Sequence, residues 1–339
     1  MLLNAPQAAV AYRTARERGF AILAVNADSP AAIIDALEAA RSVDAPVIVE
    51  TSLWQLKGRS FGNGDAALGM ARYLADCALL AEDARYADVP LIFHTDHIKG
   101  AVTLPLLKQA VAGFPLHEAR LRPSSISLDS SEMTEAENIA AIGAIAAEAA
   151  RLDLPVTLEM EAGVDDGITP LEVTERLIGG VEGPHPGRLA LYAPGAGTHH
   201  GYSAEGFPGF DPTSIRAHAD CAAAICGRPI GIALHGSSGL SDDQLRAAVA
   251  AGVAKVNWSS DSLNLRAQAA RRYWIEAESR LARDHRDFKA TAMDTAVQDA
   301  VATTYVPAIA ERMRVLGSAG MGAVLRQAIG SARSLGAQA

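Results

Sequence analysis

Short apolar segments that end in polar residues recur along the whole chain. Each has about the length of a strand and is rich in branched aliphatic residues, which is typical of strands buried on both faces of a parallel sheet. The run that begins at Val89 is representative, because it ends abruptly in His94, Thr95, Asp96 and His97. We therefore predict eight strands, each including its polar end, at residues 20–26, 46–52, 89–97, 124–129, 155–161, 188–194, 229–234 and 253–257.

Segments with helical spacing of apolar residues separate these strands. Gly19 ends the first of them, Ser29 and Pro30 begin the second, and Ser241 is a good N-cap for a later one. We expect helices at residues 8–18, 30–40, 65–83, 104–112, 134–150 and 241–251, and another that begins at 169–170. This alternation predicts a (β/α)₈ TIM barrel with its active site at the carboxyl ends of the strands. We place the barrel in residues 1–262 and a C-terminal helical extension, packed on the barrel, in residues 263–339.

Composition and charge narrow the class of ligand. The chain has 339 residues, is 49% hydrophobic and carries a formal net charge of −9, without any block of Lys and Arg. This balance argues against nucleic acid or a membrane surface as the partner and favours a small molecule. The first residues contain no basic segment followed by a long apolar one, so we expect a cytoplasmic protein.

Three histidines follow three different predicted strands. His97, His200 and His235 each stand at a strand end, which is the arrangement of a catalytic zinc that keeps one coordination position open. Taken singly, each of them is also explained as a hydrogen-bonded residue of the barrel rim. We expect His94 to point away from His97 in an extended segment and to hold a supporting contact, and His199 to stand in the same relation to His200.

Two further features at the same rim suggest chemistry on a phosphorylated substrate. Asp96 directly precedes a predicted metal ligand, so it would stay ionised and could take a proton from substrate. The alternatives are that Asp96 caps a helix or that it supports a metal-binding side chain by a hydrogen bond. Residues 236–239 and 257–261 follow the last two strands, where such barrels commonly bind phosphate. Either stretch alone is a weak signal, because most short Gly/Ser segments are only turns.

These residues resemble the class II, zinc-dependent, fructose-bisphosphate and ketose-bisphosphate aldolases. The similarity covers about residues 19–262 and is most specific in segments 94–97, 197–201, 235–239 and 255–261. The His-Thr-Asp-His form of segment 94–97, together with Leu158-Glu159-Met160-Glu161, is closer to the class IIA branch, which is typically dimeric.

The resemblance implies roles for individual residues. His97, His200 and His235 would bind one Zn²⁺ per chain, with Glu161 and Asp129 as alternative metal contacts, and a monovalent cation is a further expectation. Asp96 would be the acid/base and Asn257 would contact the enediolate. Residues matching family positions around the substrate and its dihydroxyacetone phosphate half are Asn26, Ser52, Gly201, Gly236, Ser238, Ser259 and Ser260.

The chain also departs from the family pattern in two parts of the site, the loop that carries the proton donor and the segment that binds the distal end of the substrate. The mobile loop that carries the family's proton donor is shorter here, so Asp165 is our first choice, with Asp166 and Glu182 behind it. The family's distal arginine has no clear counterpart, and we consider as substitutes Arg120, Arg122, Arg283, Arg286 and Lys289, or an arginine of a neighbouring subunit.

The resemblance implies reversible cleavage of a ketose 1-phosphate or 1,6-bisphosphate, by default fructose 1,6-bisphosphate, in a homodimer or homotetramer. The alternatives are an aldolase for tagatose bisphosphate or for a sugar phosphate with another distal group, such as a sulfonate, a zinc hydrolase on the same barrel, and a non-catalytic partner subunit.

Overall fold

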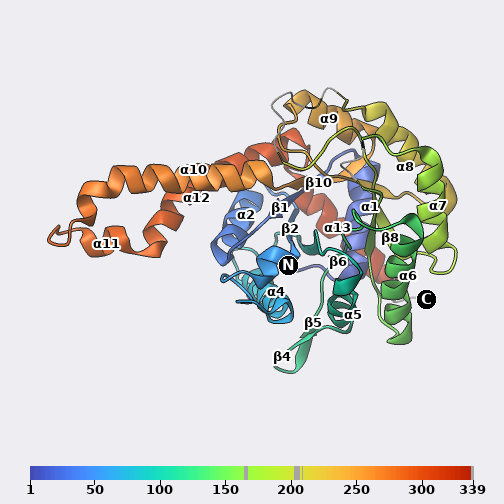
Figure 1. Cartoon of the computed structure of the whole chain (residues 1–339), viewed down its shortest axis with the longest axis horizontal. Helices are drawn as coiled ribbons and strands as arrows, with labels where there is room; N and C mark the ends of the chain where they lie inside the picture. The colour runs from blue at the N-terminus through green and yellow to red at the C-terminus, as the bar shows by residue number, and fades with distance from the viewer. Residues whose placement is uncertain (164–166, 202–206, 208, 337–339) are drawn as a thin grey trace.

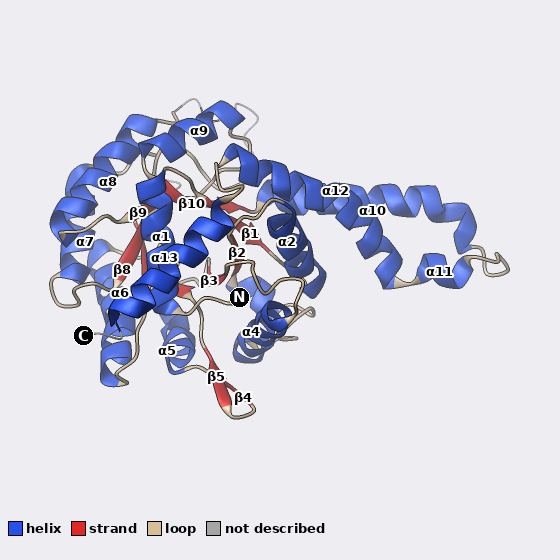
Figure 2. Ribbon diagram, turned by 180° about the vertical axis from the view of Figure 1, so that it is seen from behind, coloured by secondary structure: helices blue, strands red, loops and turns tan. Residues whose placement is uncertain are grey.

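Eight parallel strands close into a barrel, as the alternating pattern predicts. The computed structural model describes residues 1–163, 167–201, 207 and 209–336. Around the barrel the strands follow one another in the order β1, β2, β3, β6, β7, β8, β9 and β10, and β10 pairs with β1. Figure 2 shows these strands surrounded by helices. The strand bounds are Ile22–Asn26, Val47–Thr51, Leu91–Thr95, Ser125–Ile126, Leu158–Glu161, Leu189–Ala193, Gly231–Leu234 and Val253–Trp258.

The helices predicted around the barrel begin and end close to the predicted positions, and Pro212–Cys226 (α8) is a further helix for which no bounds were predicted. Ser29 accepts a hydrogen bond from the Ala32 backbone, and Ser241 forms a capping box with Gln244, so the predicted caps are confirmed. The helix bounds in this region are Ala5–Arg18 (α1), Pro30–Ser42 (α2), Leu53–Lys57 (α3), Ala66–Glu82 (α4), Leu104–Ala112 (α5), Glu135–Arg151 (α6), Leu171–Glu182 (α7), Pro212–Cys226 (α8) and Asp242–Ala251 (α9), with a 3₁₀ turn at Ala101–Thr103 (η1).

Two small elements were not predicted from the sequence. A hairpin of β4 (Phe114–Leu116) and β5 (Ala119–Leu121) lies between α5 and β6, outside the barrel, and α3 follows β2. Each hairpin strand has only three residues and Pro115 interrupts one of them, so neither has the alternation of a longer strand.

The C-terminal region forms a projecting arm and a helix under the barrel. The helices are α10 (Ser260–Ala277), η2 (Glu278–Leu281), α11 (Phe288–Ala292), α12 (Asp294–Val315) and α13 (Met321–Gly336). α10 and α12 run side by side, and their outer halves project with α11 away from the barrel (Figure 1). α12 also packs on α2, and α13 packs on α1. None of the described helices is long and apolar enough to cross a membrane.

Candidate metal centre and active site

Three imidazole rings from separate strand ends meet at the mouth of the barrel. His97 follows β3, His200 follows β8, and His235 follows β9. The ring centroids of His97 and His200 are 4.6 Å apart, and each lies about 6 Å from that of His235. One nitrogen of each ring lies within 4.8 Å of the others. The predicted convergence of these three histidines is therefore present.

The His235 ring is oriented for a metal ion. Its Nε2 lies 2.9 Å from Oε1 of Glu159, in hydrogen-bonding range, and both side chains are fully buried. No described residue hydrogen-bonds to the buried Nδ1 of His235. A metal-binding imidazole commonly pairs one nitrogen with a carboxylate and offers the other to the ion. This arrangement fits a divalent ion, and three imidazole nitrogens are a ligand set that Zn²⁺ favours.

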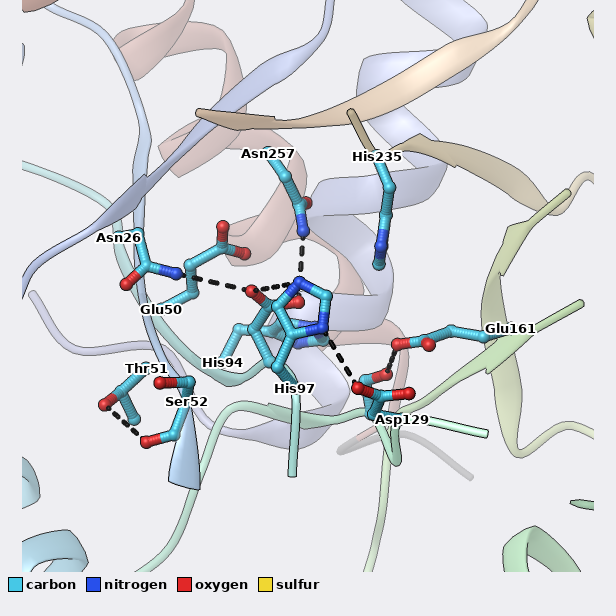
Figure 3. A network of polar contacts seen from close by, with 12 residues as sticks. Asn26, Glu50, Thr51, Ser52, His94, His97, Asp129, Glu161, His235 and Asn257 are labelled. Atoms are coloured by element: carbon cyan, nitrogen blue, oxygen red, sulfur yellow. Dashed lines mark hydrogen bonds and ion pairs between the residues drawn. The ribbon is translucent and has the colours of Figure 1, made fainter. Parts of the chain in front are cut away.

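His97 reaches the mouth through an unusual backbone conformation. Its φ is +47°, in the left-handed region, and β3 has already ended at Thr95. The expectation that His94 and His97 lie in one extended segment was therefore wrong, and the turn at His97 separates them. Nδ1 of His97 lies 3.2 Å from Oδ2 of Asp129 (Figure 3). The carboxylate of Asp96 is the largest influence that raises the pKa of His97 to about 10, so the site attracts positive charge.

Asp96 is buried and held by two side-chain amides, from the carboxyl ends of β1 and β10. Asn257 donates to its Oδ1 at 3.1 Å and Asn26 to its Oδ2 at 3.4 Å. Although burial opposes ionisation, His97 and His235 hold the pKa of Asp96 below its ordinary value. Asp96 is thus an ionised carboxylate with Oδ2 3.6 Å from Nε2 of His97. Three residues predicted for the site, Asp96, Asn26 and Asn257, form one connected group.

Glu161 and Asp129 lie beside the histidines. Asp96, Glu161 and His235 form a second, deeper cluster that could hold a metal ion. Burial raises the pKa of Glu161 to about 7, and Ser127 donates a hydrogen bond to its carboxyl group. Asp129 accepts from the Ser131 backbone as well as lying against His97, and these contacts outweigh burial and keep its pKa low. Both carboxyl groups therefore lie close enough to the histidines to be alternative contacts for a metal ion.

A charged cluster beneath the histidines was not predicted from the sequence. Nζ of Lys255 lies 3.1 Å from Glu159 Oε2 and 3.3 Å from Glu50 Oε2, and all three side chains are fully buried inside the barrel. Burial opposes the charge on Lys255, but Glu159 and Glu50 raise its pKa above the ordinary value. The same lysine and His94 outweigh burial and keep Glu159 ionised.

His94 belongs to this buried cluster. Its Nε2 lies 3.5 Å from Glu159, and its Nδ1 lies 2.7 Å from Oγ of Ser125, which in turn contacts the Tyr12 hydroxyl at 2.8 Å. A continuous series of polar contacts therefore runs from α1, below the barrel, to His235 at its mouth. The sequence contains one signal that could have predicted this cluster, namely the single charged residues at positions 50, 159 and 255 within otherwise apolar predicted strands.

The predicted phosphate residues line a cavity next to the histidines. A cavity of about 360 Å³ is lined by His97 and His200 together with Gly201, Ser259 and Ser260, and an adjoining pocket adds Gly236, Ser238 and Asn257. Gly236 has a φ of +63°, and a Cβ there would lie 2.6 Å from the His199 carbonyl oxygen, so this close approach requires glycine. His199 itself points elsewhere, with its ring against Phe207.

Ser52 lies at the opposite side of the mouth. It caps α3 and, with Trp54 and Lys57, lines a wider hollow that reaches His97 and Asp129. The Trp54 side chain is 87% exposed, which makes it the most prominent apolar group beside the site among those described. This hollow leads away from the phosphate residues.

Several predicted residues lie away from the site or outside the described chain. Asp165 and Asp166 lie outside the described residues. Glu182 pairs with Arg228, which also donates to the carbonyl of Leu189 at the amino end of β8, so Glu182 is at the wrong end of the barrel to donate a proton. The prediction for Glu182 as a reserve donor was wrong.

The arginines considered for the distal end do not reach the site of their own chain. Arg120 and Arg122 donate to the carbonyls of Gly113 and Val111, at the C-terminal end of α5, and line a mainly apolar cavity of about 300 Å³ at the amino end of the strands. The other three candidates, Arg283, Arg286 and Lys289, lie in the outer part of the arm (Figure 1). Within the described chain, none of the five lines the cavity beside the histidines.

Comparisons with known proteins agree with this geometry. The sequence model described as "Fructose-bisphosphate aldolase class-II" matches residues 7–321. The chain is 30% identical to a fructose-bisphosphate aldolase of Candida albicans over 73% of this chain and 74% of that one. It is 28% identical to that of Streptococcus pyogenes, over 91% and 96% of the two chains.

A crystal structure of fructose-bisphosphate aldolase from Campylobacter jejuni superposes with a TM-score of 0.79 at 24% identity, covering 94% of this chain and 95% of that one, and supports the fold. The family match spans nearly the whole barrel and most of the C-terminal helices. The chain therefore belongs to the class II fructose-bisphosphate aldolase family, whose members are metal-dependent carbon–carbon lyases that act on sugar phosphates.

Proposed function

We propose that this protein reversibly cleaves a ketose 1-phosphate or 1,6-bisphosphate, by default fructose 1,6-bisphosphate, into dihydroxyacetone phosphate and an aldehyde. The observation that carries the proposal is the position of His97, His200 and His235 around one point, with the ionised Asp96 beside them and a Gly/Ser-lined cavity next to them. Each part supplies one requirement of an aldol cleavage with phosphate recognition.

The three histidines would hold one Zn²⁺ per chain. When bound, the ion would act as a Lewis acid that polarises the ketose carbonyl and stabilises the negative charge that develops as the carbon–carbon bond breaks. Glu159 orients His235, and Asp129 orients His97, so the protein fixes the rings before binding. Glu161 and Asp129 remain our proposal for alternative metal contacts, and a monovalent cation stays a prediction.

Asp96 would take the proton from the substrate hydroxyl next to the bond that breaks. Its carboxylate is held ionised and oriented by Asn26 and Asn257, which limits its rotation. No described residue donates to the buried Oδ1 of Asn257, so this oxygen can accept a hydrogen bond from substrate while Nδ2 holds Asp96. Asp165 stays our proposal for the proton donor to the carbon.

The phosphate on carbon 1 would bind between the loops that follow β9 and β10. Gly201, Gly236 and Ser238 lie on one side of the cavity, and Ser259 and Ser260 lie at the start of α10 on the other. Hydroxyls and backbone N–H groups near a helix N-terminus favour a bound dianion. Ser52, across the mouth, would face the other end of the substrate.

The distal end of the substrate is recognised differently from the family pattern. The described chain brings no arginine to the cavity beside the histidines, where Lys99 is a lining cation, whereas the residues predicted for the carbon-1 phosphate all line this cavity or the adjoining pocket. Each charge-assisted contact to a phosphate is worth roughly 1.5–3 kcal/mol, so a missing arginine weakens bisphosphate binding by about one to two powers of ten. A ketose 1-phosphate with another distal group, such as a sulfonate, is therefore the second candidate substrate. Tagatose bisphosphate, which keeps the distal phosphate and differs in configuration, is a further alternative.

A cleavage screen over ketose phosphates that differ only at the distal carbon tests this proposal. We expect release of dihydroxyacetone phosphate, and we expect removal of the 1-phosphate to lower kcat/KM more than removal or replacement of the distal group. A strong preference for fructose 1,6-bisphosphate over every ketose 1-phosphate without a distal phosphate would contradict the divergence at the distal end. No cleavage of any of them would favour the non-catalytic alternative.

We also propose a homodimer or homotetramer in the cytoplasm. The arm exposes apolar side chains, with Trp274 39%, Ile275 58% and Met293 57% exposed, and a second subunit would cover them. Size-exclusion chromatography with light scattering measures this directly. The division into a barrel of residues 1–262 and an extension of residues 263–339 stays a proposal.

A further inference from the structure

Asp261 joins the two loops that form the phosphate cavity. It lies in the first turn of α10, directly after Ser259 and Ser260. Its backbone N–H donates to Oγ of Ser238 at 3.0 Å, and its carboxylate accepts from the backbone N–H of Gly239 at 3.2 Å. Since Ser238 accepts from Asp261, its hydroxyl proton is left to donate to a ligand. One residue behind the cavity thus fixes both loops.

Arg312 reaches Asp261 from the C-terminal region. Its Nη2 lies 3.2 Å from Oδ2 of Asp261, and its side chain is 14% exposed. The guanidinium also lies over the indole of Trp258, 5.4 Å from the ring centroid. Arg312 stands in the last turn of α12, so this contact connects the root of the arm to the start of α10.

Arg312 lies among closely packed side chains of α10, β10 and α12. Trp258 is buried and stacks on Tyr305 of α12, with centroids 6.0 Å apart, and the Tyr305 hydroxyl is hydrogen-bonded to the buried Ser262 of α10. Both helices are therefore locked together at the point where Arg312 meets Asp261. A guanidinium held on an aromatic face in this way keeps its direction at little cost in side-chain entropy.

The charge of this pair matters as much as its geometry. A lone carboxylate directly behind a phosphate site repels a dianion, whereas a carboxylate paired with an arginine is neutralised. We propose that Arg312 is a positioning residue for recognition of the carbon-1 phosphate, acting through Asp261. The inference rests on the proposed function, because it presumes that an anionic group of the substrate occupies this cavity.

Substitution of Arg312 should weaken the binding of phosphate without changing the binding of metal. Arg312→Met removes the charge and leaves the Asp261 carboxylate uncompensated, so we expect inorganic phosphate to bind the metal-loaded enzyme about tenfold more weakly. KM for the phosphorylated substrate should rise by a similar factor, while kcat stays within about twofold and metal content is unchanged. Arg312→Lys keeps the charge and should fall between the wild type and Arg312→Met.

A double variant distinguishes charge compensation from general loss of structure. Asp261→Asn in the Arg312→Met background removes the uncompensated carboxylate, so the double variant should bind inorganic phosphate better than Arg312→Met alone. Arg314→Met is the matched control, because Arg314 lies on the same helix, is 54% exposed and pairs only with Glu311 among the described residues. It should bind phosphate as the wild type does.

Isothermal titration with inorganic phosphate, together with metal analysis and steady-state kinetics, decides the matter. Weaker phosphate binding by Arg312→Met with unchanged metal content, and partial recovery in the double variant, supports the proposal. Unchanged phosphate binding in Arg312→Met, or parallel loss of metal and phosphate in both variants, overturns it. Absence of phosphate binding by the wild type would instead contradict the proposed function of the cavity.

Discussion

Replacing the buried Lys255 by methionine should severely destabilise the barrel. Lys255, Glu50 and Glu159 are fully buried, and Nζ of the lysine lies 3.3 Å from Glu50 and 3.1 Å from Glu159. At an effective dielectric constant of about 20, the contact with the ionised Glu159 is worth about 5 kcal/mol before the cost of burying the charges. Burial raises the pKa of Glu50 to about 8, so this carboxyl group is largely neutral at pH 7 and its contact with the lysine contributes less. Because Lys255→Met removes one partner and leaves Glu159 buried without its cation, we expect a loss of about 3–5 kcal/mol in the free energy of unfolding.

Urea unfolding followed by circular dichroism measures this loss. Lys255→Met should unfold at a much lower urea concentration, and a second substitution, Glu159→Gln, should recover part of the difference because it removes the uncompensated charge. Lys289→Met, at an exposed position on the arm, is the control and should unfold as the wild type does. A change of less than about 0.5 kcal/mol for Lys255→Met would refute the proposed energetics of the buried cluster.

The same cluster predicts a dependence on pH. Lys255 and His94 outweigh burial and hold the pKa of Glu159 well below its ordinary value of 4.5. Glu159 therefore stabilises the fold fully above this ordinary value, and the contribution is lost as the pH falls through the pKa of the folded state. The difference in stability between wild type and Lys255→Met should accordingly shrink in acid.

Three further changes test other parts of the site and the fold. Asp96→Ala should retain metal but cleave substrate roughly a hundredfold or more slowly in steady-state assays, and near-normal turnover would place the base elsewhere. His97→Ala, His200→Ala and His235→Ala should each lower metal content sharply by elemental analysis, and full occupancy in any of them would remove that residue from the ligand set. Burial raises the pKa of Asp35 from 3.8 to about 6, so the protonated Asp35 of the folded state favours folding below pH 3.8, and this contribution is lost as the pH rises to 6. Asp35→Asn should therefore stabilise the protein by about 1–2 kcal/mol at pH 8, as measured by urea unfolding, and have no effect near pH 3. An equal effect of Asp35→Asn at both pH values would contradict this assignment.

The barrel could be predicted because its strands are apolar on both faces. Runs such as residues 47–49 and 91–93 have no polar interruption, and each is followed within four residues by a residue, Ser52 or His97, that marks the mouth. The hairpin formed by β4 and β5 escaped prediction because its strands are too short for periodicity. Strand periodicity is informative only over longer segments.

The site could be predicted where strand order alone brings residues together. His97, His200 and His235 converge because parallel strands in a barrel end at one face, whatever the details of packing. The buried Lys255 and the pair of Arg312 with Asp261 depend instead on which side chains face inward and on where α12 meets α10. Such contacts link segments far apart in the sequence. Single charged residues at positions 50, 159 and 255 mark the buried cluster, but no spacing or composition pairs Arg312 with Asp261.

Removal and restoration of the metal ion tests the central claim most directly. The protein is dialysed against a chelator, and release of dihydroxyacetone phosphate from ketose phosphates is measured before and after Zn²⁺ is added back. We predict that the metal-free protein is inactive, that one equivalent of Zn²⁺ per chain restores cleavage, and that borohydride traps no substrate on the enzyme. Full cleavage by the metal-free protein, with substrate trapped on a lysine by borohydride, would contradict the account and indicate a Schiff-base mechanism.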